Sequence, residues 1–282
     1  MSEIEHVSDT AFWVAAYRAQ ESERPDAVFR DRLASVLVGE RGRAIERRMP
    51  GGRLMSFLIV VRTSAIDRLI LQAIARGVDT VLNLGAGLDT RPYRMSLPQS
   101  VRWIEADFPA LIRHKDQTLA RETPACALER VGLDLSDQAA RQALVQRVAE
   151  QAGAVLVITE GVIPYLKDED VARLAEDLRG EPKIRYWIQD YYSERARRRR
   201  PSWRKKMKAA PFLFRAPDWF GFFARFGFQP AERINVRQAY LQIGRPPPFA
   251  VPRLLLYSLM PAKWQEKAAE NLGYVLLERR EP

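Results

Sequence analysis

Apolar side chains recur at helical spacing along roughly the first 75 residues of the chain. The pattern predicts three helical stretches, at Ala11–Gln20, Asp26–Leu37 and Leu54–Ala75, the last being one long helix or two abutting ones. The run Pro50-Gly51-Gly52 interrupts the pattern, and Gly77 marks its end. We therefore expect a helical cap region over residues 1–78.

From Thr80 onward, short apolar runs alternate with helical patterns. The apolar runs predict strands at Thr80–Leu84, Val101–Ala106, Cys126–Val131, Ala154–Thr159 and Ile184–Tyr191. Helical patterns at Asp137–Gln151 and Lys167–Leu178 lie between them, with Ser136 or Asp137 and then Asp168 as candidate N-caps. This alternation predicts an α/β fold, with a doubly wound, mostly parallel sheet that helices cover on both faces.

The last third of the chain has a less regular pattern. It predicts a helix at Pro217–Phe226, a turn at Arg245–Pro248, one or two helical pieces in Pro252–Glu270 and a final strand at Gly273–Glu278. We expect residues 79–282 to form the core domain of the protein, with inserted lid or substrate segments around residues 193–215 and 237–268.

The composition restricts the class of protein and the cellular environment that we expect for this fold. Hydrophobic residues make up 47% of the 282 positions, which is typical of a globular chain, and no apolar run reaches the length of a membrane span. The single cysteine, Cys126, excludes an internal disulfide, and with only His6 and His114 the chain has no Cys/His zinc cluster, so no metal is expected. A reducing cytoplasm is the simplest setting. No pattern specifies an oligomeric state.

The formal net charge of +10 raises the question of a nucleic-acid partner. Much of the excess lies in one segment, Arg195–Lys208. A solvated loop or lid is the favoured interpretation, because blocks of like charge are often solvated or disordered. A nucleic-acid-binding module remains an alternative, and it predicts an affinity that falls steeply as salt rises.

Glycines and acids directly follow the predicted strands. They are Gly85, Ala86 and Gly87 after the first strand, Asp107 after the second, Asp134 and Leu135 after the third, and Glu160 after the fourth. The carboxyl ends of parallel strands meet at one edge of a sheet, where ligands bind. Glycine there lets a ligand approach the backbone, and an acid about 20 positions further on suits ribose hydroxyls. An acid with apolar neighbours, such as Asp134, suits an adenine edge.

The glycine loop departs from the dinucleotide fingerprint at Leu88-Asp89-Thr90, where a third glycine would stand. A pyrophosphate favours a helix N-terminus without a nearby negative charge, so Asp89 disfavours a nicotinamide-dependent oxidoreductase. The same acid is compatible with S-adenosylmethionine, which has no phosphate and carries a positive sulfonium.

Three motifs resemble the leucine carboxyl methyltransferase family, including its bacterial branch of polyketide-synthesis-type O-methyltransferases. They are Gly85-Ala86-Gly87-Leu88-Asp89-Thr90-Arg91, Glu105-Ala106-Asp107-Phe108-Pro109 with Lys115 downstream, and Glu160-Gly161-Val162-Ile163-Pro164-Tyr165-Leu166. Residues 8–11, 18–22 and 29–34 and the tripeptide Val61-Arg62-Thr63 also resemble that branch, so the likeness covers roughly residues 8–190.

The resemblance implies a Rossmann-like class I methyltransferase with a seven-stranded sheet, an N-terminal helical extension and a C-terminal helical insertion. Its residue-by-residue implications concern binding of S-adenosylmethionine: Arg62 on the methionine carboxylate, Gly85 and its loop along the tail, Asp107 on the ribose, Asp134 and Leu135 beside the adenine, and Glu160 near the amino group. Tyr165 is a candidate for the substrate side of the site.

The implied reaction is an in-line displacement that transfers a methyl group to oxygen. A carboxylate acceptor is ionised at neutral pH, whereas a phenol or an alcohol usually requires a general base. With two histidines in the chain, the sequence favours a carboxylate, and we expect a small-molecule acceptor with a carboxylate or hydroxyl oxygen. An RNA methyltransferase and a non-catalytic cofactor-binding relative remain alternatives.

Overall fold

The computed structural model describes residues 8–48, 52–193, 211–248, 259–261, 264–265 and 270–280. The basic segment Arg195–Lys208 and most of Pro252–Glu270 lie outside the described residues. Three helices precede the sheet, namely α1 (Asp9–Ser22), α2 (Arg32–Arg48) and α3 (Gly52–Ala75). The prediction that the second helix begins at Asp26 is wrong. The Asp31 carboxylate instead accepts the backbone N–H of Ala34 at 3.0 Å, a capping interaction that starts α2 at Arg32.

Seven strands form one sheet in the order β3-β2-β1-β4-β5-β7-β6. Their bounds are β1 (Thr80–Leu84), β2 (Arg102–Asp107), β3 (Ala127–Gly132), β4 (Val155–Thr159), β5 (Ile184–Tyr192), β6 (Phe228–Asn235) and β7 (Leu272–Arg279). Strands β1 to β5 pair in parallel, while β7 runs antiparallel to both β5 and β6. The prediction of a doubly wound, mostly parallel sheet is confirmed.

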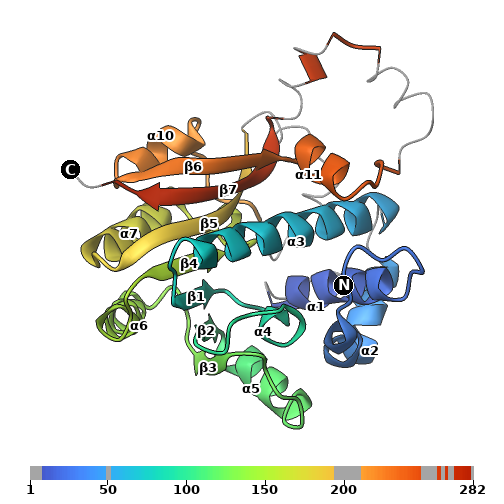
Figure 1. Ribbon diagram of the computed structural model, residues 1–282, viewed down its shortest axis with the longest axis horizontal. Coiled ribbons are helices and arrows are strands. Elements are labelled where there is room, and N and C mark those ends of the chain that lie inside the picture. Colours follow the sequence, from blue (N-terminus) through green and yellow to red (C-terminus); the bar gives the residue numbers. More distant parts are fainter. Residues whose placement is uncertain are drawn as a thin grey trace.

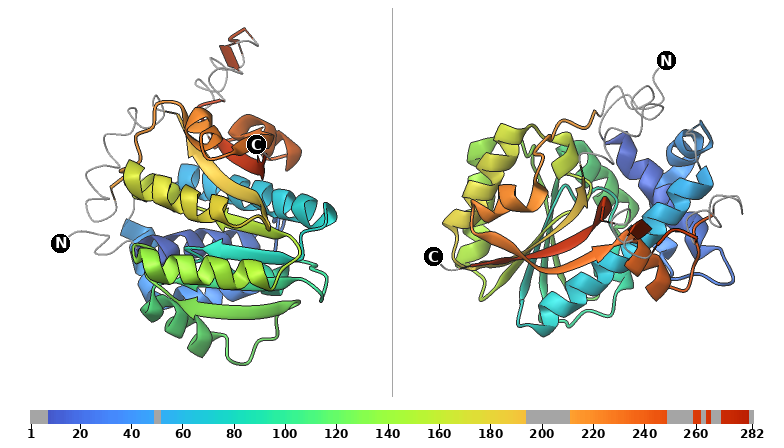
Figure 2. Two further views of the ribbon diagram at one scale, coloured as in Figure 1. Left: turned by 90° about the vertical axis from the view of Figure 1, so that its left-hand side faces the viewer. Right: turned by 90° about the horizontal axis from the view of Figure 1, so that it is seen from above.

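Helices cover both faces of the sheet, as Figures 1 and 2 show. The helices α6 (Gln138–Glu150), α7 (Asp168–Gly180) and α10 (Trp219–Ala224) share one core cluster with β4 and β5, and α3 and α11 (Val236–Gln242) share the other. Strand β4 is buried along its whole length because Val157 belongs to the first cluster and Leu156 to the second. Such burial on both sides is typical of a central parallel strand.

A third core cluster joins the N-terminal helices to the sheet region. Trp13 of α1, Leu37 of α2 and Met55 of α3 pack there with Leu111 of α5 (Pro109–Thr118). In Figure 1, α1 and α2 lie beside α3 at one side of the sheet. None of the described helices is long and apolar enough to cross a lipid bilayer.

One predicted cap is confirmed and one is wrong. The Asp137 side chain caps α6 by accepting the backbone N–H of Ala140 at 3.1 Å. Asp168 does not cap α7, because Lys167 occupies the N-cap position. The Asp168 Oδ1 accepts the backbone N–H of Arg215 at 2.6 Å instead, and so ties a distant segment to the start of the helix.

The strand order reverses between β1 and β4. The chain moves outward from β1 to β2 and β3 on one side, and from β4 to β5 on the other. Ligands of doubly wound sheets bind in the crevice at such a reversal, outside the carboxyl ends of the strands. The loops after β1 and β4 therefore define where a site is expected.

Candidate functional site

A cavity of about 420 Å³ opens at this edge of the sheet. Every residue predicted for the site lines it: Arg62, Gly85, Ala86, Gly87, Asp107, Asp134, Leu135, Glu160 and Tyr165. The structure therefore brings together residues from α3 and from the ends of four strands. Their individual roles stay predictions.

The two glycines of the loop after β1 have left-handed backbone angles, with φ of 72° at Gly85 and 53° at Gly87. A Cβ at Gly85 would lie 2.4 Å from the Cγ2 of Val162, and one at Gly87 would lie 3.2 Å from the Cβ of Ala11. A Cβ at Gly85 would thus clash with the loop after β4, and one at Gly87 would crowd α1, apart from any approach by a ligand.

Two of the predicted acids differ in environment. Asp107 is 9% exposed, and its Oδ2 accepts the backbone N–H of Gly87 while its Oδ1 accepts that of Phe108, both at 2.7 Å. Asp134 is exposed and accepts the backbone N–H and the hydroxyl of Ser136, at 2.9 and 2.8 Å. Asp107 therefore shapes the glycine loop directly, whereas Asp134 organises its own turn.

Arg62 and Glu160 form an ion pair that spans α3 and the loop after β4. The Arg62 Nε lies 2.7 Å from the Glu160 Oε1, and its Nη1 lies 3.9 Å from the Oδ2 of buried Asp190. Burial alone would raise the pKa of Glu160, but Arg91 and Arg62 outweigh it and lower that pKa. Glu160 is thus ionised and has a cation on each side.

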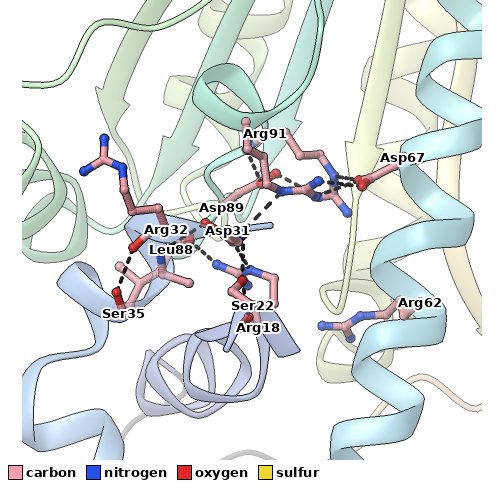
Figure 3. Close-up of polar contacts among 12 residues, drawn as sticks. Arg18, Ser22, Asp31, Arg32, Ser35, Arg62, Asp67, Leu88, Asp89 and Arg91 are labelled. Carbon is pink, nitrogen blue, oxygen red and sulfur yellow. Dashed lines mark hydrogen bonds and ion pairs between the residues drawn. The ribbon is translucent and has the colours of Figure 1, made fainter. Parts of the chain in front are cut away.

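Arg91 connects three carboxylates beneath the glycine loop, as Figure 3 shows in part. Its Nη1 lies 2.7 Å from the Glu160 Oε2 and 2.8 Å from the Asp89 Oδ2, and its Nε lies 2.7 Å from the Asp67 Oδ1. Asp89 also accepts a hydrogen bond from the Asn83 amide at 2.9 Å. The pKa of Asp89 is lowered, because Arg91 and neighbouring cations outweigh its burial.

These contacts change the interpretation of Asp89. Sequence reasoning treated its negative charge as unfavourable for a phosphate-bearing ligand. In the structure, Arg91 pairs with that charge, so Asp89 serves to hold α4 (Arg91–Arg94) and the glycine loop together. Its value in distinguishing one cofactor from another is therefore smaller than the sequence suggested.

A second ion pair fixes the cap helices to the glycine loop. Arg18 of α1 lies with its Nε 2.8 Å from the Oδ2 of Asp31, which is fully buried, and its Nη2 donates to the carbonyl oxygen of Leu88. Figure 3 shows Arg18 between Asp31 and Leu88, while Arg62 projects from α3 on the other side. Arg18 is 13 positions from Asp31 and 70 positions from Leu88 in the sequence, so no local pattern indicates these two contacts.

Aromatic residues also line the cavity. Tyr165, in the short helix η1 (Ile163–Tyr165), packs edge-on against Phe212 with ring centroids 5.1 Å apart. Tyr192 at the end of β5 and Tyr274 of β7 also line the cavity. Burial raises the pKa of Tyr165 and of Tyr274, so both hydroxyls keep their protons. Sequence reasoning identified Tyr165 alone, because the others lie far along the chain.

No histidine lines the cavity among the residues that the structure describes. The Nε2 of His114 lies 3.1 Å from the carbonyl oxygen of Leu37, and its ring packs against Phe12 with centroids 5.2 Å apart. His114 therefore contributes to the packing of α5 against the cap helices. His6 lies outside the described residues.

Comparison with known proteins agrees with these features. A relative from Parafrankia sp., provisionally named an S-adenosyl-L-methionine-dependent methyltransferase, is 38% identical over 182 residues, which are 61% of this chain and 58% of that protein. A Streptomyces coelicolor protein with the same provisional name is 37% identical over 178 residues, 58% of this chain and 62% of its own length. This chain thus covers about three fifths of these curated relatives.

Solved structures share the fold. A DUF574 family protein from Streptomyces avermitilis superposes with a TM-score of 0.56 at 15% identity, covering 94% of this chain and 97% of that one. A protein from Thermobifida fusca, whose description provisionally assigns it as a methyltransferase, gives 0.55 at 16% identity, with 95% and 94% covered. The sequence model of leucine carboxyl methyltransferase matches residues 11–179, more than half of the 282 positions. This chain therefore belongs to the leucine carboxyl methyltransferase family.

Proposed function

We propose that the protein is an S-adenosylmethionine-dependent O-methyltransferase that acts on a small molecule with a carboxylate or hydroxyl oxygen. One observation carries the proposal: the glycine loop, Asp107 and the Arg62–Glu160 pair line a single cavity at the strand reversal. Membership of the family and the names of the relatives support the choice of methyl donor. Assignment to the polyketide-synthesis branch stays a prediction.

The charges of the cavity suit the methyl donor. Its amino-acid tail carries one carboxylate and one ammonium, which match the guanidinium of Arg62 and the carboxylate of Glu160. Asp107 lies at the end of β2, where it can accept hydrogen bonds from ribose hydroxyls, and Asp134 and Leu135 lie beyond it for the adenine. In this proposal the donor lies across the ends of β3, β2, β1 and β4.

When bound, S-adenosylmethionine supplies an electrophilic methyl group, which passes to the acceptor oxygen while the carbon–sulfur electron pair stays on sulfur. The protein then contributes position and exclusion of water. Arg62 holds the methionine carboxylate and Asp107 the ribose, and the apolar side chains of Trp13, Met55 and Leu58 line the cavity from α1 and α3.

We further propose that the cap region, residues 1–78, and the segments around residues 193–215 and 237–268 cover the site. Of residues 193–215, the structure describes 193 and 211–215.

A carboxylate acceptor suits the titratable groups of the cavity better than an alcohol. The described lining holds no histidine, the pKa of Glu160 is lowered, and the pKa of Tyr165 is raised. Neither Glu160 nor Tyr165 is therefore suited to accept a proton near neutral pH. A carboxylate needs none, because it is already ionised.

Titration calorimetry with S-adenosylhomocysteine and with NAD tests the donor. We expect saturable binding of the first; tight binding of NAD without a response to S-adenosylhomocysteine would overturn the proposal. Incubation with isotopically labelled S-adenosylmethionine and a set of acids and alcohols tests the acceptor oxygen. A methyl ester releases methanol in mild base and a methyl ether does not, so base treatment of the product separates the two.

A further inference from the structure

The lining of the cavity follows the order of the strands. Predicted donor-binding residues follow β3, β2, β1 and β4, whereas Tyr192 ends β5 and Leu272 and Tyr274 begin the antiparallel β7. The last two stand level with the end of β5, because Leu272 pairs with Tyr192 and Tyr274 with Asp190. If the donor lies as proposed, the part of the cavity at β5 and β7 is left for the acceptor.

This acceptor end extends over two strand spacings. Neighbouring strands lie about 4.8 Å apart, so the two steps from β4 through β5 to β7 span roughly 10 Å. Its walls are apolar or aromatic, with Leu166 and Phe212 beside the three tyrosines Tyr165, Tyr192 and Tyr274.

Phe212 joins two of these tyrosines into one aromatic wall. Its ring centroid lies 5.1 Å from that of Tyr165 at an interplanar angle of 79°, and 5.7 Å from that of Tyr192 at 55°. Such tilted and edge-on arrangements are the favoured geometries of aromatic pairs. The three rings come from η1, from the end of β5 and from the segment 211–216, so the wall exists only in the folded chain.

The segment 211–216 is anchored on the C-terminal side of Phe212. The backbone N–H groups of Leu213 and Phe214 donate to the Pro164 carbonyl oxygen at 2.7 and 3.3 Å, and that of Arg215 donates to Asp168 at 2.6 Å. The Phe214 side chain is 1% exposed and packs edge-on against Trp219 at 5.0 Å. Phe212 lines the cavity and directly precedes these anchored residues.

Two hydroxyl groups lie at this wall. Tyr165 and Tyr274 keep their protons, because burial raises the pKa of each hydroxyl, and both side chains line the cavity. Each can donate to an acceptor oxygen, while the ring of the acceptor contacts Phe212. The geometry points to a planar aromatic carboxylic acid as the methyl acceptor and to Phe212 as a residue that determines its selection. This inference rests on the proposed methyltransferase function.

The test compares two acids that differ in aromaticity, benzoic acid and cyclohexanecarboxylic acid. With the full chain and S-adenosylmethionine, we expect kcat/KM for methyl ester formation to be about three- to tenfold higher for benzoic acid, the range that one aromatic contact supports. In Phe212→Leu, which keeps an apolar side chain, this preference should fall toward one, mainly through a higher KM.

Phe220→Leu is the matched control, because Phe220 packs on Tyr191 at 5.0 Å and does not line the cavity. It should keep the preference of the parent. The inference is overturned if the two acids are used equally well, if Phe212→Leu keeps the full preference, or if S-adenosylhomocysteine binds but neither acid is methylated. Absence of S-adenosylhomocysteine binding would instead overturn the proposed function itself.

Discussion

Asp107 offers a direct test of the proposed donor geometry. Its two oxygens accept the backbone N–H groups of Gly87 and Phe108, both at 2.7 Å, and so hold the glycine loop against the end of β2. In Asp107→Asn, one oxygen becomes an NH2 group, which cannot accept either hydrogen bond and faces a backbone N–H. The substitution therefore changes both the loop and the proposed ribose site, with almost no change in side-chain volume.

The expected loss follows from these contacts. A hydrogen bond to a charged group contributes about 1.5–3 kcal/mol, and an unsatisfied buried donor costs about 1–3 kcal/mol. We expect the free energy of unfolding to fall by about 1–3 kcal/mol in the absence of ligand. The variant also lacks a ribose hydrogen bond of similar strength in the complex. Because about 1.4 kcal/mol corresponds to a tenfold change in Kd, the Kd for S-adenosylhomocysteine should rise at least roughly tenfold.

Titration calorimetry measures the Kd, and denaturant unfolding measures the stability. Asp137→Asn is the control, because Asp137 caps α6 and asparagine caps helices about as well as aspartate. The control should leave both quantities unchanged. An Asp107→Asn protein that is folded and binds S-adenosylhomocysteine within about threefold of the parent would refute the assignment of the ribose site.

Three other changes test the surrounding structure. Arg62→Gln should raise the KM for S-adenosylmethionine at least about tenfold, from the loss of a charged contact with the methionine carboxylate, and an unchanged KM would reject that role. Gly85→Ala places a Cβ 2.4 Å from Val162 at a φ of 72°, so unfolding free energy should fall by about 1–3 kcal/mol, and Val162→Ala in the same chain should restore part of it. Burial acts to raise the pKa of Asp31, but the nearby Arg18 more than offsets this effect, and the pKa is lowered. The ionised Asp31 carboxylate therefore stabilises the fold above about pH 4, and this stabilisation is lost as the pH falls through the lowered pKa. Asp31→Asn should therefore be less stable at pH 7 and lose less stability on acidification, as followed by denaturant unfolding at several pH values.

The central fold was predictable because its elements carry local patterns. Strand β1 was predicted with the bounds that the structure gives, since a β-branched apolar run ends at Gly85. Strand β6 was missed. It contains Pro230, its register shifts between Pro230 and Glu232, and half-buried positions alternate along it, all of which are typical of an edge strand. Edge strands depend on a neighbour for their pairing, and that neighbour, β7, lies more than 30 positions further along the chain.

The site residues that could be predicted from sequence patterns alone are those at the ends of strands. Asp107 and Glu160 follow predicted strands, so topology alone placed them at one edge. Arg62 came from resemblance, because nothing in a helical pattern distinguishes a cavity-facing arginine from a surface one. The partners of the network, such as Asp67 and Asp31, were missed because each pairs with arginines far away in sequence.

The Arg62–Glu160 pair has a consequence for how the donor binds. The two groups are already 2.7 Å apart, so if the donor lies as proposed, its zwitterionic tail would exchange that contact for two new ones, guanidinium to carboxylate and carboxylate to ammonium. Arg91 holds the other oxygen of Glu160 at 2.7 Å, and the Oδ2 of Asp190 lies 3.9 Å from the Nη1 of Arg62. Each member would therefore keep a neighbouring group during such an exchange, which limits the cost of leaving a buried charge unpaired. We infer that Asp89 and Asp67, which hold Arg91 in place, support donor binding without contacting the donor.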